Sequence, residues 1–273
     1  CSQTNINLEI LPFLGYLAAI GIGVVLELIG GGGSIITVPV MVYLLGINPV
    51  TATAYSLFLV GVASTVGAAR NAQLGHIDYR TGIVFSIPAF MAVYVTRAFI
   101  IPKIPENILT IQQFVLTKNT AVMLFFAFLM VLAAVSMIRS KEQQSMRSNT
   151  IRIQLPLILL EGTVVGIVTG LVGAGGGFLI IPALVLVAGL EIKAAIGTSL
   201  LIIAIKSLIG FIGDVQNSPI DWKFLLLFTT LAVAGIFIGL AYNQFMKGER
   251  LKKLFGWFVL VMGLGIVIKE IVL

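Results

Sequence analysis

The sequence predicts an all-α polytopic membrane protein with two inverted-topology repeats, each a helical hairpin with a Gly-rich break followed by three crossing helices. Three observations support this fold class. The 273 residues are 59% apolar and 10% charged, whereas a soluble chain carries about 25% charged residues. Apolar runs of roughly 20 residues recur, and a helix of that length spans the hydrocarbon core of a bilayer. The two halves of the chain also share a sequence pattern.

The composition excludes several classes of protein. A chain with so few charges would expose large apolar patches in water, which rules out a soluble enzyme or a nucleic-acid-binding module. The net charge of +6 comes from basic residues in short gaps between apolar runs, a pattern typical of membrane topology signals. One cysteine excludes an internal disulfide and a cysteine metal cluster. We interpret Cys1 as an ordinary first residue; a lipid-bearing cysteine is the alternative.

The apolar runs form two sets of five, and the two sets correspond. They cover 10–29, 34–46, 50–74, 81–101 and 118–138, then 155–172, 177–190, 194–213, 222–245 and 254–271. The halves superpose without a gap when position 23 is placed on position 166: 17 of 58 positions are identical between 23–80 and 166–223. Shared glycines, prolines and aspartates are hard to obtain from hydrophobicity alone, so we infer an internal duplication. We expect a first repeat at 10–138, a cytoplasmic linker at 139–154 and a second repeat at 155–271.

The short runs at 34–46 and 177–190 decide the expected topology. Each is about 20 Å long as a helix, too short to span comfortably, and each follows a run of glycines that breaks the helix. We therefore expect each to return to its own side of the membrane. Each half then crosses three more times, and this odd number places the second half upside down relative to the first.

The basic residues assign the sides. Eleven of the seventeen fall in 70–80, 139–152, 190–194 and 247–253, and we expect this side to be cytoplasmic, with both termini outside. Lys206 lies inside an apolar run. The expected outer side receives five: Arg97, Lys103, Lys118, Lys223 and Lys269.

The two glycine runs are the first candidate site. Each precedes a short helix, whose first N–H groups are unpaired and carry partial positive charge. Two such helix starts related by inversion would form an anion site near the midplane of the bilayer. Close helix packing is the alternative role of these glycines. The residues expected at the site are Gly32, Gly33, Ser34, Gly175, Gly176 and Gly177.

Polar side chains on the next long helix of each half are further candidates. Lys206 lies near mid-helix with apolar neighbours, seven residues after Ser199 and on the same face. A lysine there is costly unless it is paired or wetted, so we expect it to bind substrate or a counter-ion. Arg70 occupies the equivalent helix and also has an ordinary interfacial role as an alternative. Ser56, Thr198 and Ser199 either bind an oxyanion or bond to their own helix carbonyls.

The acidic residues divide into two groups. Glu27 and Glu161 lie in apolar hairpin helices and are candidates for proton coupling or for pairing with Lys206. Asp78 and Asp221 precede helices and are expected to be N-caps. Polar residues at helix ends, Asn71, Gln73, Asp214 and Gln216, are expected to be solvated. No metal ligand set can be assembled around His76, and no cofactor is expected.

The strongest motifs resemble a known family. The second half contains Gly166, Gly170, the run Gly173–Gly177 and Pro182, then Ala195–Leu200 and Ile220-Asp221-Trp222-Lys223. The first half has weaker versions at Gly30–Pro39, Ala54–Leu57 and Ile77–Arg80. This pattern, over about 12–271, resembles the sulfite exporter family TauE/SafE; the family pattern usually has an apolar residue where this chain has Lys206. The resemblance implies a multi-pass transporter of the prokaryotic inner membrane for sulfur-containing anions, driven by an ion gradient.

We therefore expect a secondary transporter that exports sulfite or an organosulfonate, coupled to a proton or another cation. The expected partners are the anion, the coupling ion and the lipid bilayer; nucleic acid is not expected, and a homodimer is left open. An anion channel, or a transporter of a non-sulfur organic anion, is the alternative. An intramembrane enzyme is not expected, because no nucleophile–base set is visible in the sequence.

Overall fold

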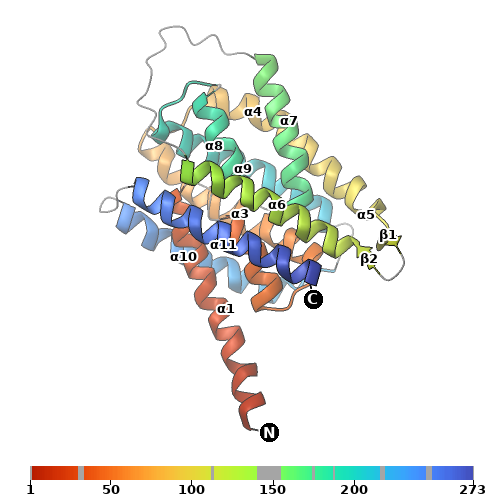
Figure 1. Cartoon of the computed structure of the whole chain (residues 1–273). Coiled ribbons are helices and arrows are strands. Elements are labelled where there is room, and N and C mark those ends of the chain that lie inside the picture. Colours follow the sequence, from red (N-terminus) through yellow and green to blue (C-terminus); the bar gives the residue numbers. More distant parts are fainter. Residues whose placement is uncertain are drawn as a thin grey trace.

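The computed structural model describes residues 2–29, 34–111, 114–139, 155–173, 176–186, 188–215, 219–243 and 248–272, and these are almost entirely helical (Figure 1). The first half forms α1 (Ser2–Ile29), α2 (Ser34–Pro39), the π-helical turn η1 (Val40–Leu44), α3 (Pro49–Gln73), α4 (Tyr79–Val95), the π-helical turn η2 (Thr96–Ile100), α5 (Ile101–Lys103), β1 (Asn107–Ile111), β2 (Phe114–Thr117) and α6 (Lys118–Arg139). The second half forms α7 (Leu155–Val172), α8 (Gly177–Leu186), α9 (Ile192–Val215), α10 (Trp222–Asn243) and α11 (Gly248–Val272). The expected linker at 139–154 lies almost wholly outside the described residues.

The all-α polytopic prediction is confirmed. In the described part of the chain, five helical segments are long and apolar enough to cross a membrane: Pro49–Gln73, Tyr79–Lys103, Lys118–Ser136, Lys193–Val215 and Trp222–Ala241. The short helices end as expected. The helix of α2 and η1 and that of α8 are both followed by a glycine with positive φ, Gly46 at 68° and Gly189 at 66°, and these two glycines occupy equivalent positions in the two halves. Such a φ favours glycine at a helix C-terminus.

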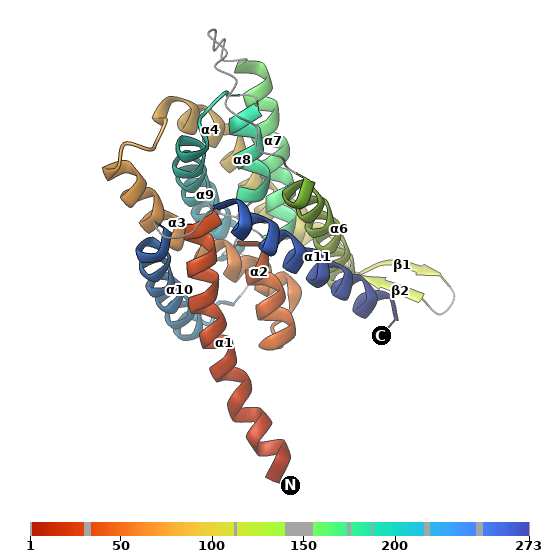
Figure 2. The ribbon, with the colours of Figure 1, turned by 60° about the vertical axis from the view of Figure 1, so that its left-hand side comes forward.

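The sequence analysis missed the antiparallel pair of β1 and β2, which joins η2 and α5 to α6. The two strands project from the body beside the C-terminal end of α11 (Figures 1 and 2). A pair of short strands is compatible with a membrane protein where water can satisfy its free edges, and this one lies at a helix end.

The centre of the molecule is an antiparallel contact between α3 and α9. Gly61 faces Leu208, Gly67 faces Leu200, and Gly210 faces Leu57, so residue numbers rise along one helix as they fall along the other. Glycines allow this close approach, which is how membrane helices gain dispersion energy in lipid. The two helices occupy equivalent places in the two halves of the sequence. A twofold axis perpendicular to both helices would relate them in this antiparallel way.

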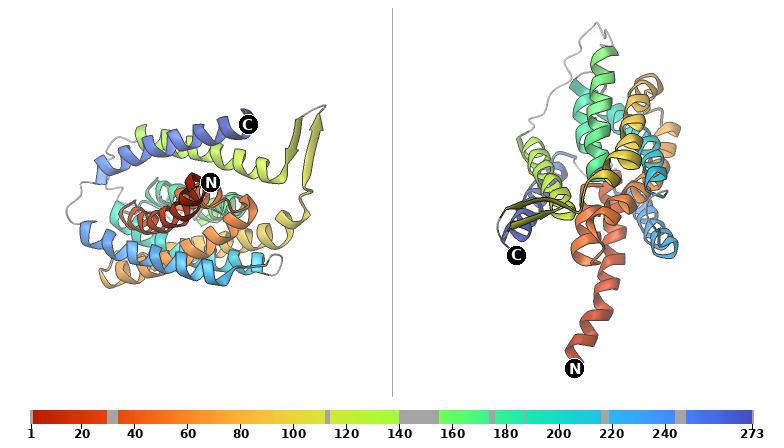
Figure 3. Two further views of the ribbon diagram at one scale, coloured as in Figure 1. Left: turned by 90° about the horizontal axis from the view of Figure 1, so that it is seen from below. Right: turned by 90° about the vertical axis from the view of Figure 1, so that its right-hand side faces the viewer.

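The outer helices exchange partners between the halves in the same way. Helix α1 packs on α10, α7 packs on α4, and α6 packs on α11 (Figure 3). In the first pair Gly23 lies against the carbonyl of Ala232; in the second, Gly166 lies against the carbonyl of Ala89. Gly166 is the equivalent of Gly23 in the other half, and Ala89 is the equivalent of Ala232. The same contact of a glycine with an alanine carbonyl therefore occurs at equivalent positions of the two halves.

The helix caps repeat this exchange. Asp78 and Asp221 cap α4 and α10, accepting hydrogen bonds from the amides of Thr81 at 2.9 Å and Phe224 at 3.1 Å, which confirms both N-cap predictions. The amide of Asp78 donates to Thr198 Oγ1 across the halves at 2.9 Å, and the amide of Asp221 donates to the Tyr55 hydroxyl at 2.8 Å. Tyr55 and Thr198 are also equivalent positions of the repeat. The two hydrogen bonds thus fasten opposite ends of the α3–α9 pair.

The outer surface is apolar, as lipid contact requires. Large side chains recur every three or four residues on the exposed faces of the peripheral helices, for example Ile83, Ile87, Met91 and Val95 on α4, and Trp257, Val261, Leu264 and Ile268 on α11. Such continuous apolar faces are unfavourable in water and match the hydrocarbon core of a bilayer. The chain is therefore a multi-pass membrane protein.

We predict that alanine at Gly23 or Gly166 destabilises the fold, because the added Cβ would overlap the carbonyl of Ala232 or Ala89. Overpacking of this kind costs about 1–3 kcal/mol. The measurement is the apparent melting temperature of the purified protein in detergent. Gly21→Ala is the matched control on the same helix, since no atom lies within 4 Å of a Cβ there. Equal melting temperatures for Gly23→Ala and Gly21→Ala would contradict the close contact.

Candidate anion-binding site

The glycine break before α8 is the best described part of the predicted site. Gly173 and Gly176 both have a φ of +70°, a conformation that favours glycine. Gly176 and Gly177 are buried, and α8 begins at Gly177. The amides of Leu179 and Ile180 already donate to the carbonyl of Gly176. Gly175, Gly32 and Gly33 lie outside the described residues, whereas Ser34 is fully buried as the first residue of α2.

Lys206 reaches this break from α9. The side chain is fully buried, and its Nζ donates to Thr169 Oγ1 on α7 at 2.9 Å. A Cβ placed on Gly176 would lie 3.0 Å from the same Nζ, so glycine is what lets the ammonium approach the backbone. In the described part of the chain, Lys206 forms no ion pair with a carboxylate. Its cationic group therefore lies beside a hydroxyl and an irregular backbone segment, an arrangement that suits an anion.

The predicted hydroxyls have different surroundings. Ser199 donates to the carbonyl of Ile196 at 2.8 Å, and Thr198 accepts from the amide of Asp78, so both are engaged by backbone. Ser56 is fully buried, and its Oγ has no hydrogen-bond partner among the described residues. A buried polar atom without a partner needs a physical explanation. Ser56 thus has an unpartnered hydroxyl, unlike Thr198 and Ser199.

Arg70 and Glu161 are not brought to this centre. Arg70 is exposed near the end of α3, where its Nη1 donates to Gln73 Oε1 at 3.0 Å. Glu161 is only partly buried on α7. The position of Arg70 matches its alternative role as an ordinary interfacial residue, and no ion pair joins Glu161 to Lys206 among the described residues.

Glu27 is buried, in contrast to Glu161. Its side chain is 3% exposed, and its Oε2 has no hydrogen-bond partner among the described residues. The carboxylate lies beside Gly67 of α3, where a Cβ would be 3.0 Å from Oε2, and its Cβ lies beside Gly239 of α10. Residue 27 is in the last turn of α1, immediately before the first glycine run.

Arg97 and Asp214 are buried together. The prediction that Asp214 is solvated at a helix end is wrong: it is 5% exposed and forms an ion pair with Arg97, which is 0% exposed. The assignment of Arg97 to the outer side stays a prediction. Arg97 Nη1 lies 3.4 Å from each Asp214 oxygen and donates to Thr53 Oγ1 at 2.9 Å. Asn71, also expected to be solvated, is buried and donates to the carbonyl of Gly67 at 2.9 Å.

Packing between helices buries these groups. Arg97 lies in the π-helical turn η2, and its Cβ packs against Gly213 of α9. In the sequence it stands four residues from the end of an apolar run, a position typical of an arginine that extends to the interface. No local signal in the sequence distinguishes it from such an arginine, because its burial depends on a contact with α9.

The buried charges occupy three levels along α9. Glu27 lies at the level of Leu200, Lys206 follows six residues later, and Arg97 lies at the level of Gly213. At 1.5 Å per residue, the levels are about 9 and 10 Å apart. The charges thus follow the α3–α9 contact from one side of the membrane toward the other.

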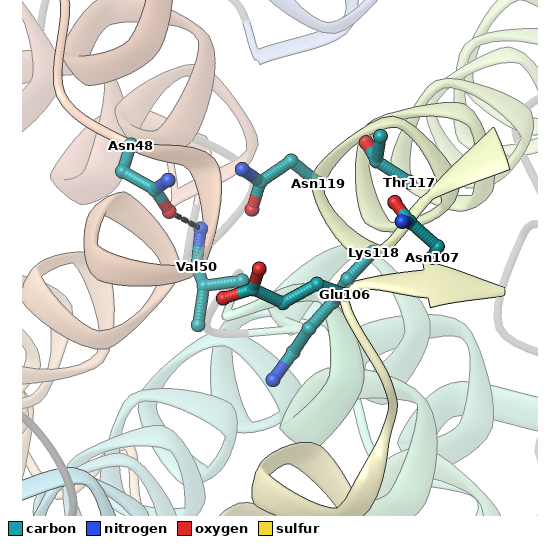
Figure 4. A pocket seen from close by; sticks show the side chains of 7 residues that line it. All are labelled: Asn48, Val50, Glu106, Asn107, Thr117, Lys118 and Asn119. Carbon is teal, nitrogen blue, oxygen red and sulfur yellow. Dashed lines mark hydrogen bonds between the residues drawn. The ribbon is translucent and has the colours of Figure 1, made fainter. Parts of the chain in front are cut away.

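An open pocket lies beyond Arg97, at the helix ends opposite the linker. It has a volume of about 380 Å³ and separates the start of α3 from the β1–β2 pair and the start of α6 (Figure 4). Its lining is mostly polar: Asn48, Val50, Glu106, Asn107, Thr117, Lys118 and Asn119.

An apolar exterior, a glycine break between helices and buried charges along a central helix pair are typical of a multi-pass membrane transport protein. The sequence profile described as "Sulfite exporter TauE/SafE" matches residues 15–266. The chain belongs to the TauE/SafE sulfite exporter family, whose members are membrane transporters.

Two of the relatives described next span most of the chain, and a third spans part of it. A "Probable membrane transporter protein" of Xylella fastidiosa (strain Temecula1) is 25% identical and covers 90% of this chain and 91% of its own length. "Probable membrane transporter protein YunE" of Bacillus subtilis is 25% identical over 87% and 89%. "Probable membrane transporter protein MJ0441" of Methanocaldococcus jannaschii is 36% identical over 39% and 42%. No solved structure matches the chain. These relatives place the protein in a prokaryotic membrane.

We predict that Thr169→Val lowers stability by about 1–3 kcal/mol because it removes the acceptor of a buried ammonium. The loss should disappear when Lys206→Met is also present, and Lys206→Met alone should raise stability by removing a buried charge. Apparent melting temperatures of the four proteins form the double-mutant cycle. An equal loss in both backgrounds would show that Thr169 supports helix packing rather than the ammonium.

Proposed function

We propose that this protein is a secondary transporter that exports a small sulfur-containing oxyanion, sulfite or an organosulfonate, in exchange with or together with protons, and that it is not an enzyme. The observation that carries the proposal is the fully buried Lys206, whose ammonium lies at Gly176 beside Thr169. A buried ionisable group inside a membrane protein is a functional-site hypothesis by default. The family supports sulfite as the first substrate to test.

The substrate contacts would come from several directions. Lys206 supplies a point charge with three rotatable donors, and the start of α8 supplies backbone dipole. A tetrahedral sulfonate suits converging single donors without the planar fork of an arginine. Ser56 is a further donor because its Oγ has no partner among the described residues. The equivalent break at Gly32, Gly33 and Ser34 would complete the site from the other half, with Gly175, Thr198 and Ser199 in its wall.

The arrangement of the halves supports alternating access. We propose that the two repeats are inverted in the membrane; the antiparallel packing of α3 on α9 and the exchanged contacts of Gly23 and Gly166 support this. In inverted-repeat transporters the site lies near the midplane at the interface of the repeats, and rocking of one repeat opens it to each side in turn. Lys206 projects from α9, one of the two helices in the central contact, toward Thr169 and Gly176 of the second half.

Glu27 is the better candidate for proton coupling. It is buried, lies next to the first break and has an unpartnered oxygen, whereas Glu161 is partly exposed. A carboxyl in an apolar site takes up a proton readily, because burial disfavours its charged form. Proton binding at Glu27 would therefore change the charge of the central interface by one unit.

The first test is flux into proteoliposomes. We predict saturable transport of sulfite or ethanesulfonate that responds to a pH gradient and is abolished by Lys206→Met, which removes the charge at nearly constant volume. Lys193→Met is the matched control on the same helix, because Lys193 is exposed.

Each other outcome has a separate meaning. Transport of neither anion by the wild type would refute the sulfur assignment. Persistent transport by Lys206→Met would refute the proposed site, and flux without saturation or gradient dependence would identify an anion channel.

A second test addresses coupling. We predict that Glu27→Gln keeps anion exchange but loses the response of net flux to a pH gradient, because glutamine cannot bind and release the coupling proton. Glu161→Gln is the matched control and should retain the response. The readout is the ratio of net flux with and without the gradient. A gradient response retained in Glu27→Gln and lost in Glu161→Gln would reassign the role.

A further inference from the structure

The Arg97–Asp214 pair differs from an ordinary structural ion pair. Its contacts are long: Nη1 lies 3.4 Å from both carboxylate oxygens, whereas charge-assisted N–H···O bonds are about 2.7–2.9 Å. One guanidinium nitrogen serves both Thr53 and Asp214. The arginine is fully buried, so its charge loses contact with water. The long contacts to Asp214 offset little of that desolvation cost.

The other edge of the guanidinium, formed by Nε and Nη2, is buried and has no hydrogen-bond partner among the described residues. Asp214 Oδ2 likewise accepts no hydrogen bond from them. Nε and Nη2 form the edge that binds two oxygens of one anion side by side. Buried donors of a charged group are costly to leave unpaired.

Arg97 is close to both the pocket and the glycine break. Thr53, which accepts from Arg97, donates to the carbonyl of Val50 at 2.7 Å, and Val50 lines the pocket. Lys118, also in the lining, donates to the carbonyl of Ile101, one helical turn beyond Arg97. On the other side, Gly173 lies directly against Thr53. Arg97 thus stands between the pocket and the break that Lys206 reaches at Gly176.

The pocket itself carries one charge of each sign in its lining, Lys118 and Glu106 (Figure 4). Its formal charges therefore balance, so it offers no strong selection between anions and cations. Beyond the pocket, Nε and Nη2 of Arg97 are donors that have no hydrogen-bond partner among the described residues. Asp214 is the carboxylate that lies beside Arg97 in this structure.

We propose that Arg97 forms a second oxyanion subsite, distinct from the Lys206 site and reached from the pocket at the start of α3 and α6, and that Asp214 competes with the anion for Arg97. The inference rests on the proposed function for the identity of the anion. The sulfonate head binds the Nε–Nη2 edge, and Asp214 holds the arginine when the subsite is empty. An anion entering or leaving where α3 and α6 begin then passes from the pocket to Arg97 and on, past Gly173 and Gly176, to Lys206.

The test is equilibrium binding of radiolabelled sulfite to the purified protein, carried out in the Lys206→Met background so that the central site does not contribute. We predict that binding persists in this background. Asp214→Asn tightens it by roughly tenfold, because a competing carboxylate is removed. Arg97→Gln combined with Asp214→Asn weakens it by roughly tenfold or more relative to Asp214→Asn alone, because charged hydrogen bonds are lost.

The double variant Arg97→Gln, Asp214→Asn keeps the test independent of folding. Arg97→Gln alone leaves a buried carboxylate unpaired, whereas the double variant is neutral at both positions. Arg70→Gln is the matched control for an exposed arginine and should leave binding unchanged. If Arg97 serves only as the structural counter-ion of Asp214, Asp214→Asn will not tighten binding, and the double variant will bind as its parent does; either result overturns the proposal.

A second readout places the subsite on the predicted path. With Cys1→Ser and Val50→Cys, the pocket carries the single thiol of the chain. Ethanesulfonate should slow its modification by a membrane-impermeant neutral maleimide added from the pocket side, and this protection should be lost in the Arg97→Gln, Asp214→Asn variant. Protection that is unchanged in this variant would overturn the proposal.

Flux separates this inference from the proposed function. Sulfite binding that depends on Arg97 without any transport would leave the subsite standing and refute the exporter. Gradient-driven sulfite transport, with sulfite binding that does not depend on Arg97, would leave the exporter standing and refute the subsite.

Discussion

The close antiparallel contact of α3 with α9 is the constraint on which the rest of the structure depends. In lipid, helices gain little from hydrophobic association, so small residues must bring the backbones together. Gly61, Gly67 and Gly210 do this along the length of the pair. The remaining helices surround the pair, and α1 and α7 reach across it to the opposite half.

This contact also explains where charge can be buried. Lys206, Arg97 and Glu27 all lie against α3 or α9 or project from them, at levels where a glycine leaves room: Gly176 for Lys206, Gly213 for Arg97 and Gly67 for Glu27. The same residue type thus serves two purposes in the central layer. It lets helices approach, and it admits polar groups that lipid would not tolerate.

Equivalent positions of the two halves are similar in their packing and different in their charges. The cap hydrogen bonds of Asp78 and Asp221 and the contacts of Gly23 and Gly166 occur in both halves. The charged groups do not: Lys206 corresponds to Ala63, Arg97 to Leu240 and Glu27 to Gly170. The two halves therefore share packing contacts but not these buried charges.

The sequence alone determined the class of fold, the short helices after the glycine runs, both N-caps and the position of Lys206 within an apolar helix. These are local properties: run length, turn-forming residues, and a charge far from either end of an apolar helix. The tertiary structure alone decided that Arg97 and Asp214 are buried together, that Glu27 and not Glu161 is enclosed, and that Arg70 is exposed. Near the end of a helix, sequence cannot distinguish a side chain that extends to water from one covered by a neighbouring helix, because that depends on a contact with a distant part of the chain.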